Sequence, residues 1–360
     1  MKILLLGDFS ALHKNLKEGL EALNHEVVLA SHGDHWKKIE NDIDLNYKSK
    51  FLPHNISSRI FPLLDINSLT GFDIIQIINP FFMYRKYFPT KQYLEYICKR
   101  NKKSFILGAG DDAFFWQIAR KKMKYGPFDD YLKYDLKVEK FFLETQKTMQ
   151  YNKDILDIVD GLIPIMYEYE VGYKSEYDKP NKIKKVIPIP INTDKIEYHP
   201  NKVKDKIVIF HGLNRYGFKG TKYVEEAFEI LNKKYPNDLE LVIKGNMPLN
   251  DYLKLMQRTN IVIDQTNSYS LGVNGVYALA MGKIVLGGAE KESLDSLGVN
   301  KSPIINIKPS AKSIIEEIEK ILENRDNIES LGYKSRIFAK NVHNYKIVAQ
   351  RYIDTWQGKR

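Results

Sequence analysis

The sequence predicts an α/β protein made of two doubly wound domains, each with a parallel sheet covered by helices. The 360 residues suit two cores of roughly 150–190 residues each. Short apolar segments rich in β-branched residues alternate with helical patterns along the chain, as in parallel sheets that are buried on both faces. A proline-rich segment at 184–200 separates two such series. We therefore expect two sheets whose carboxyl ends border a ligand cleft.

The first series begins with a five-residue apolar strand, Lys2–Leu6. The helix after it carries Leu12, Leu16, Leu20 and Leu23 at the spacing of one helical face. A β-loop-α-β start of this kind is typical of doubly wound domains. Further strands are expected at 25–31, 73–78, 104–107 and 161–165.

The linker KKVIPIPINTDKIEYHP (184–200) holds three prolines and cannot be helical through its middle. We place the first domain at 1–190 and the second at 191–340, and expect 341–360 to be a helix that packs back towards the first domain. Strands of the second series are expected at 207–210, 239–243, 261–264, 284–286 and 304–307. Helices are expected at 222–234, 274–281 and 312–324, and as two segments within 328–356 that meet near 343–344.

Composition narrows the class of protein. The hydrophobic fraction of 43% and the charged fraction of 28% are those of a globular chain. No stretch approaches the roughly 18 apolar residues of a membrane span, and the single cysteine, Cys98, excludes an internal disulfide. These features favour the cytoplasm. The net charge of +10 favours anionic partners, meaning phosphates, nucleic acid or an acidic membrane surface, without choosing among them.

The strongest local signal is IVIFHGLNRYGFKGTKYVEEAFEIL (207–231), in which a strand leads through a loop into a helix at about residue 221. Gly212, Gly217 and Gly220 allow close backbone approach, and the helix start offers N–H groups and partial positive charge. Arg215 and Lys219 add full charges, and we expect Lys219 to be exposed. The pattern predicts a diphosphate cradle; a plain turn with surface cations is the alternative, because the loop matches no standard phosphate motif.

This loop, with its K-G before the helix, resembles the phosphate-binding loop of retaining family-4 glycosyltransferases. The next strand, LELVIKGNMP (239–248), resembles the family's strand that ends in a glycine near the nucleotide. The segment IVIDQTNSYSLGVNGVYALAMGKIVLGG (261–288) resembles its donor loop, with Gly272 at the turn glycine and ALAMGK (278–283) at A-M-A-x-G-K. The linker and the closing helices are also similar, so the resemblance covers about 184–358 well and 1–30 moderately.

The resemblance implies a GT-B fold of two Rossmann-like domains. It implies transfer of a sugar from a nucleoside-diphosphate sugar to a glycan or lipid-linked acceptor, with retention of configuration and no metal or other cofactor. Arg215 and Lys219 would stabilise the leaving diphosphate. The residues implied to bind the donor are Gly212, Gly217, Gly245, Gly272, Asn274 and Tyr277.

Two departures from the family pattern stand out. The family's paired glutamates fall on Tyr269 and Tyr277. The second glutamate usually holds the nucleotide ribose in the family, so here this contact comes from elsewhere, for example from Asn274, or is absent. The family's histidine in the first domain has no equivalent in FILGAGDDAFFW (105–116), which offers Asp111 and Asp112 instead. These departures keep open a non-catalytic protein of the same fold that binds glycan or partners an active transferase. A nucleotide-sugar epimerase is a third interpretation.

Several polar residues at predicted strand ends allow two interpretations each. Asp111 and Asp112 are candidate catalytic groups that accept a proton or orient an acceptor hydroxyl, or else they cap the next helix. Asp8 and Ser10 follow the first strand and are acceptor-side candidates, with capping again the alternative for Asp8. His211 is more readily structural than catalytic. His13 is expected to be a partly exposed helical residue.

The stretch 79–103 mixes aromatic residues with seven cations and one acid. Such a segment can lie on an anionic lipid surface, which would make the protein peripheral at the inner face of the membrane. A helix that buries its aromatic face and solvates its lysines is the simpler interpretation. Nucleic acid is the least favoured partner, and we expect none.

Overall fold

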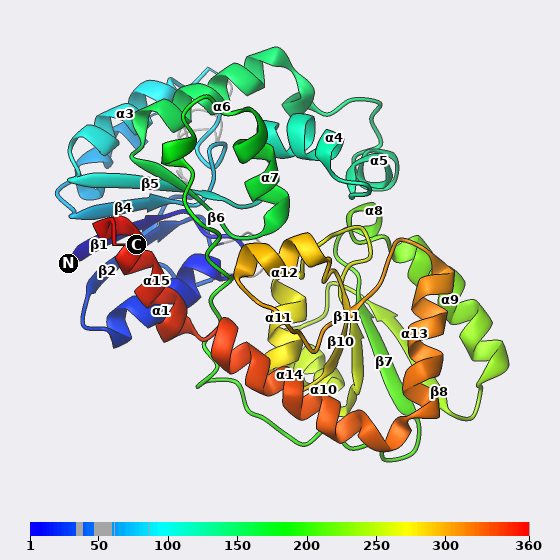
Figure 1. The fold of residues 1–360 in the computed structure, drawn as a ribbon. Coiled ribbons are helices and arrows are strands. Elements are labelled where there is room, and N and C mark those ends of the chain that lie inside the picture. Colours follow the sequence, from blue (N-terminus) through cyan, green and yellow to red (C-terminus); the bar gives the residue numbers. More distant parts are fainter. Residues whose placement is uncertain (34–38, 47–59, 61, 86, 360) are drawn as a thin grey trace. The chain divides into compact units, whose positions relative to one another are not determined.

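The computed structural model describes residues 1–33, 39–46, 60, 62–85 and 87–359. The chain forms two compact units, shown in Figure 1 with its colours following the sequence. The first unit comprises 1–119, 142–192 and 345–360, and the second comprises 120–141 and 193–344. We expected 120–141 in the first domain; it belongs to the second unit because its side chains bind loops there, as described below.

The described part of the first unit holds a parallel sheet in the order β3-β2-β1-β4-β5-β6. Its strands are β1 (Lys2–Leu6), β2 (Glu26–Ser31), β3 (Ile43–Asp44), β4 (Ile74–Ile77), β5 (Lys103–Gly108) and β6 (Gly161–Pro164). Its longer helices are α1 (Leu12–Ala22), α3 (Thr90–Lys99), α6 (Gln146–Ile158), α7 (Tyr167–Glu176) and α15 (Tyr345–Gln357). Short helical turns are η2 (Ile66–Leu69), η3 (Phe115–Ala119), η5 (Phe142–Glu144) and η6 (Pro180–Lys182).

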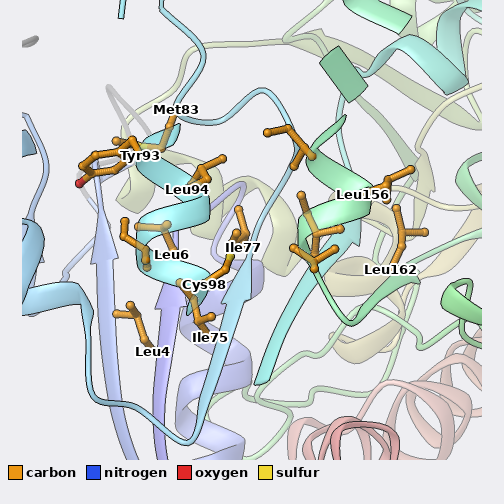
Figure 2. Close-up of a cluster of buried hydrophobic side chains, with 14 of the residues drawn as sticks. Leu4, Leu6, Ile75, Ile77, Met83, Tyr93, Leu94, Cys98, Leu156 and Leu162 are labelled. Atoms are coloured by element: carbon orange, nitrogen blue, oxygen red, sulfur yellow. The ribbon is translucent and has the colours of Figure 1, made fainter. Parts of the chain in front are cut away.

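Alternation along the strands directs side chains to the two faces of this sheet. Leu4 and Leu6 of β1 lie in one hydrophobic cluster with residues of β4, α3 and α6 (Figure 2). Gln76 of β4 points to the opposite face of the sheet, where its Oε1 accepts a hydrogen bond from Trp356 Nε1 of α15 at 3.0 Å. Helix α15 also packs beside α1, as the red and blue helices of Figure 1 show, and Gly19 of α1 leaves no room for a side chain there.

The described part of the second unit holds a parallel sheet in the order β11-β10-β9-β7-β8. Its strands are β7 (Ile207–Gly212), β8 (Leu239–Lys244), β9 (Ile261–Ile263), β10 (Ile284–Gly287) and β11 (Ile305–Asn306). Its helices are α8 (Tyr216–Lys219), α9 (Thr221–Lys234), α10 (Leu249–Arg258), α11 (Val273–Ala280), α12 (Lys291–Leu297), α13 (Ala311–Glu323) and α14 (Ile328–Val342), with the turn η7 (Arg325–Asn327). The segment 120–141 adds α4 (Arg120–Lys122), α5 (Phe128–Asp130) and η4 (Tyr131–Leu136).

The second core is built mainly from isoleucine. Ile207 and Ile209 of β7 pack with the apolar faces of α9 and α13, which cover one side of the sheet. Ser310 caps α13 by accepting a hydrogen bond from Ser313 N at 3.2 Å. The predicted strands and helices of both series are confirmed, most of them within two residues of the expected bounds.

Candidate functional site

Strand β7 leads into the loop that the sequence singles out, and His211 anchors its base. The ring is fully buried, with Nδ1 at 2.9 Å from Ile263 O and Nε2 at 2.9 Å from Thr221 Oγ1. The carbonyl oxygen requires a proton on Nδ1, so Nε2 accepts from the threonine hydroxyl. Burial, with the nearby charge of Lys219, lowers the pKa of His211 to about 3. His211 therefore stays neutral and joins β7, β9 and α9, which is the structural role that we favoured.

Lys219 lies at the end of α8 and is 9% exposed, so the expectation of an exposed cation is wrong. Its Nζ lies 3.5 Å from Asp264 Oδ1, and its carbonyl accepts a hydrogen bond from Thr266 N at 3.0 Å. The side chain turns inward because Asp264 offers a charge partner at the end of β9. Lys219 therefore stabilises the loop itself, in addition to any contact that it makes with a ligand.

Asp264 joins this loop to the turn before α11. Its Oδ2 accepts a hydrogen bond from Gly272 N at 2.7 Å. A Cβ at Gly275 would lie 2.8 Å from the same oxygen, so glycine there lets the helix approach the carboxylate. One buried carboxylate thus positions both the K-G loop and the predicted donor loop. The sequence signal for this role is an acid directly after a buried strand.

The donor-side candidates on α11 lie close to this carboxylate. Gly272 precedes the helix, and Asn274 and Tyr277 are half-buried on its first two turns. Burial raises the pKa of Tyr252 to about 12, and the charges of Asp264 and Tyr277 add to the shift. Asp264 and Tyr277 therefore each lie near Tyr252, on the side of the unit that carries the donor-side candidates.

Arg215 is the exposed cation of the loop. Its guanidinium lies over the Phe218 ring, 3.5 Å from the centroid, and 5.5 Å from the centroid of Tyr131. Stacking on an aromatic ring holds the charge in place. Arg215 is thus better placed than Lys219 to meet a ligand from solvent.

Three of the predicted glycines serve contacts within the chain. A Cβ at Gly217 would lie 2.1 Å from Asp130 O, and one at Gly245, after β8, would lie 1.6 Å from Leu213 O. Gly220 has a φ of +70° and joins α8 to α9. At Gly212 an added Cβ would make only ordinary contacts. The structure therefore explains Gly217 and Gly245 by close approach of the protein's own backbone.

The segment 120–141, which we call the strap, binds both loops, and our sequence analysis missed it. Asp135 Oδ2 accepts hydrogen bonds from Gly217 N at 2.7 Å and from Phe218 N at 3.0 Å. Asp130 pairs with Lys222 Nζ at 2.7 Å. The acids in FDDYLKYD (128–135) are the available signal, but they bond partners more than 80 residues away along the chain.

The strap also explains the tyrosine at the first family-glutamate position. Tyr269 is buried, and its hydroxyl accepts a hydrogen bond from Lys124 N at 2.9 Å. Its ring lies 4.8 Å from that of Tyr125, whose hydroxyl donates to Glu290 Oε1 at 2.7 Å. Tyr269 therefore holds the strap against the donor loop in this structure.

In the first unit, Asp8 and Ser10 follow β1 as predicted. The Asp8 carboxylate is 3% exposed and accepts hydrogen bonds from His13 N at 3.0 Å and Lys14 N at 3.3 Å, so it caps α1. Ser10 is half-buried with a φ of 54°. The expectation of a partly exposed His13 is wrong: it is fully buried, lies 2.6 Å from Gly7 O through Nδ1, and burial lowers its pKa to about 4.

Asp111 and Asp112 differ in environment. Asp112 is fully buried and accepts hydrogen bonds from Phe115 N at 2.8 Å and Tyr173 OH at 2.7 Å, while burial raises its pKa to about 6. Asp112 therefore caps the helical turn that follows it, which is the alternative to a catalytic role given above. Asp111 is half-buried and accepts a hydrogen bond from Trp116 Nε1 at 3.1 Å. Of the two, Asp111 is the one that an acceptor could reach.

The aromatic and basic stretch at 79–103 largely follows the simpler interpretation. Helix α3 buries Tyr93, Leu94 and Ile97, while Lys99 and Lys102 pair with Glu95 and Asp73. Lys86 lies outside the described residues. Across the described part of the chain, every helix is too short or too polar to span a bilayer.

Among the residues that the structure describes, no three histidine, cysteine, aspartate or glutamate side chains are grouped to hold a metal ion. Near the loops, positive charge is provided by Arg215, Lys219 and Lys222.

Comparisons with solved structures identify the fold. Sucrose-phosphate synthase from Thermosynechococcus elongatus matches with a TM-score of 0.68 at 13% identity, over 99% of each chain. The Anabaena protein HepE, in complex with UDP and glucose, matches with a TM-score of 0.66 at 11% identity, over 99% of each chain. A UDP-GlcNAc 2-epimerase from Neisseria meningitidis bound to UDP-GlcNAc matches with a TM-score of 0.56 at 13% identity, over all of both chains.

These similarities extend over essentially the whole chain and confirm the predicted two-domain GT-B fold. No protein-family model and no curated protein sequence matches the chain. At such low identity the likeness establishes the fold, and function must be argued from the residues.

Proposed function

We propose that this protein is a glycosyltransferase that uses a nucleoside-diphosphate sugar. The observation that carries the proposal is the buried Asp264, which joins two loops at the carboxyl ends of parallel strands by contacting Lys219 at 3.5 Å and Gly272 N at 2.7 Å. Ligands of doubly wound sheets bind at such strand ends. Similar structures that contain UDP or a UDP-sugar support a nucleotide sugar as the ligand.

In the proposed reaction, the bond between the sugar and the diphosphate breaks while an acceptor hydroxyl attacks the sugar. Negative charge develops on the departing diphosphate, and fixed positive charge nearby lowers the energy of that state. Arg215, held on Phe218, and Lys219, held by Asp264, would supply this charge without a metal. Gly272, Asn274 and Tyr277 would line the nucleotide side.

The acceptor is proposed to be a glycan or a lipid-linked sugar that meets the first unit near Asp8, Ser10 and Asp111. Asp111 would accept or orient the hydroxyl proton, since Asp112 is fully buried in its own loop. The net charge of +10 suits an anionic membrane surface as the place where a lipid-linked acceptor is met. Retention of configuration is proposed from the family resemblance.

Two other functions have a specific observation in their favour. A non-catalytic binding protein is favoured by Tyr269, which occupies a family-glutamate position and bonds the strap. A nucleotide-sugar epimerase is favoured by the fold shared with the Neisseria enzyme. An epimerase returns an isomeric sugar, a transferase releases nucleoside diphosphate, and a binding protein does neither.

Thermal unfolding with UDP, ADP, GDP and their sugars tests donor binding, because a ligand of the folded state raises Tm by mass action. We expect one nucleotide class to raise Tm. The matched variant Arg215→Gln, which removes an exposed charge without disturbing the core, should weaken that shift. A panel in which no nucleotide changes Tm would contradict the proposal.

A further inference from the structure

We propose that the strap competes with an anionic ligand for binding to the loop after β7. The ligand binds this loop only when the strap's carboxylates are displaced from it. The inference rests on the function proposed above and adds a means of regulation at the same site. It is carried by three sets of contacts, all within the second unit.

The first set places a carboxylate on the loop's own backbone. Asp135 Oδ2 accepts hydrogen bonds from both Gly217 N and Phe218 N, at 2.7 and 3.0 Å. Carboxylate and phosphate oxygens seek the same N–H donors. The strap thus provides the kind of group that an anionic ligand of this loop would provide.

The second set places a carboxylate on a cation next to the loop. Asp130 Oδ1 lies 2.7 Å from Lys222 Nζ, and its Oδ2 accepts a hydrogen bond from Asn267 Nδ2 at 3.3 Å. Burial alone would lower the pKa of Lys222, but the hydrogen bonds and charges of Asp130 and Tyr223 together outweigh it, and the pKa is raised. Asp130 therefore neutralises a positive charge and also ties the loop after β9 to the strap.

The third set of contacts shows that the strap packs closely and specifically against the loop. The rings of Tyr131 and Phe218 pack edge to face with centroids 5.3 Å apart, and those of Tyr134 and Tyr216 do the same at 5.3 Å. At Gly217 the strap's backbone leaves no space for a Cβ. Complementary aromatic and backbone packing is what a specific intramolecular contact requires.

These contacts have an electrostatic consequence. A diphosphate that approaches Arg215 and the Gly217 and Phe218 amides meets Asp135 and Asp130, whose charge has the same sign as its own. While no ligand is bound, the carboxylates occupy the amide N–H groups and the lysine. A ligand must displace these carboxylates and is repelled by their negative charge. Lowering the strap's negative charge should therefore strengthen binding.

Asp135→Asn is the direct test. Asparagine keeps the shape and an oxygen that can accept the two amide hydrogen bonds, but it removes the charge. Asp129→Asn is the matched control, because Asp129 is the strap's acid whose side chain is 87% exposed and pairs with Arg120 within the strap. Dissociation constants for UDP, ADP and GDP are measured by calorimetry for both variants and the wild type.

We expect Asp135→Asn to bind the preferred nucleotide at least tenfold more tightly than the wild type, and Asp129→Asn to match the wild type. Equal or weaker binding by Asp135→Asn would show that Asp135 merely caps the loop, which overturns the inference and leaves the proposed function standing. Failure of all three proteins to bind any of the nucleotides would overturn both.

Hydrogen–deuterium exchange gives a second test that needs no variant. In the wild type, saturating nucleotide should increase amide exchange in 120–141, because the bound ligand displaces the strap. Slower or unchanged exchange there, with protection at 212–220, would show that ligand and strap bind together and would contradict competition.

Discussion

Lys219 and Asp264 form a buried ion pair, with Nζ and Oδ1 3.5 Å apart and side chains 11% and 1% exposed. The same carboxylate accepts a hydrogen bond from Gly272 N. Lys219, which we propose to stabilise the leaving diphosphate, is therefore held in position by Asp264. The same acid also holds the turn at Gly272. Breaking a buried pair leaves one charge uncompensated, so this contact links stability with ligand binding.

Replacing Lys219 by alanine should remove nucleotide binding and also lower the free energy of unfolding by about 3 kcal/mol, because Asp264 would lose its partner. Lys234→Ala, which removes a lysine from the exposed end of α9, is the control and should change both quantities little. Calorimetry and chemical unfolding supply the two measurements. Wild-type affinity in Lys219→Ala would remove this lysine from the site.

Tyr277 should not be exchangeable for the family's glutamate. Tyr277→Glu would add a negative charge to α11 on the proposed nucleotide side, and repulsion of the anionic ligand should weaken nucleotide binding at least tenfold. Tyr277→Phe removes the hydroxyl and keeps the ring, so it separates ring packing from hydrogen bonding. Activity that rises in Tyr277→Glu would identify the natural chain as an inactive member of its fold.

Stability should fall as the pH is lowered below 6.5, since the pKa of buried His211 is about 3 in the folded state. The unfolded chain takes up a proton near pH 6.5 that the folded chain cannot accept, so unfolding becomes easier as pH falls. Between neutral pH and pH 5 the loss from His211 should be about 2 kcal/mol. His211→Gln should remove this part of the dependence and leave the part that buried His13 contributes with the same sign, measured by urea unfolding.

His199→Gln is the matched control, because that imidazole is half exposed. It should leave the pH dependence as it is in the wild type. Identical slopes in His211→Gln and the wild type would mean that His211 is protonated in the folded protein, against the burial and hydrogen bonds described above.

Donor use should survive EDTA, because Arg215 and Lys219 are proposed to supply the positive charge for the diphosphate. The measurement is nucleoside diphosphate release with and without chelator. Inactivation that added Mn²⁺ or Mg²⁺ reverses would show that a metal performs this task.

Local sequence patterns were enough to predict most of the fold. The runs ILLL in β1 and IVIF in β7 are short and apolar because both faces of a parallel strand are buried. Such a run can be recognised from the local sequence alone, without knowing which strand pairs with it. The helices α13 and α14 were also expected close to their observed bounds. The family resemblance then predicted the loops that Asp264 joins, although not the inward turn of Lys219.

The strap could not be predicted in the same way. Asp135 and its partner Gly217 are 82 residues apart, and nothing in FDDYLKYD distinguishes acids that bind amides from acids in water. The same reason explains His13 and Lys219, whose burial depends on Gly7 and Asp264 lying nearby in the fold. Long-range pairing of single polar residues leaves no periodic trace in a sequence.

The central claim, transfer from a nucleotide sugar, is tested most directly by incubating the protein with UDP-, ADP- and GDP-sugars and measuring nucleoside diphosphate release. The account predicts slow release from one nucleotide class, even to water, and none from the other two. It also predicts that Arg215→Gln reduces this release at least tenfold, since its charge would no longer stabilise the leaving group. Absence of release from every donor, or conversion of the sugar to an isomer with the nucleotide still attached, would contradict it.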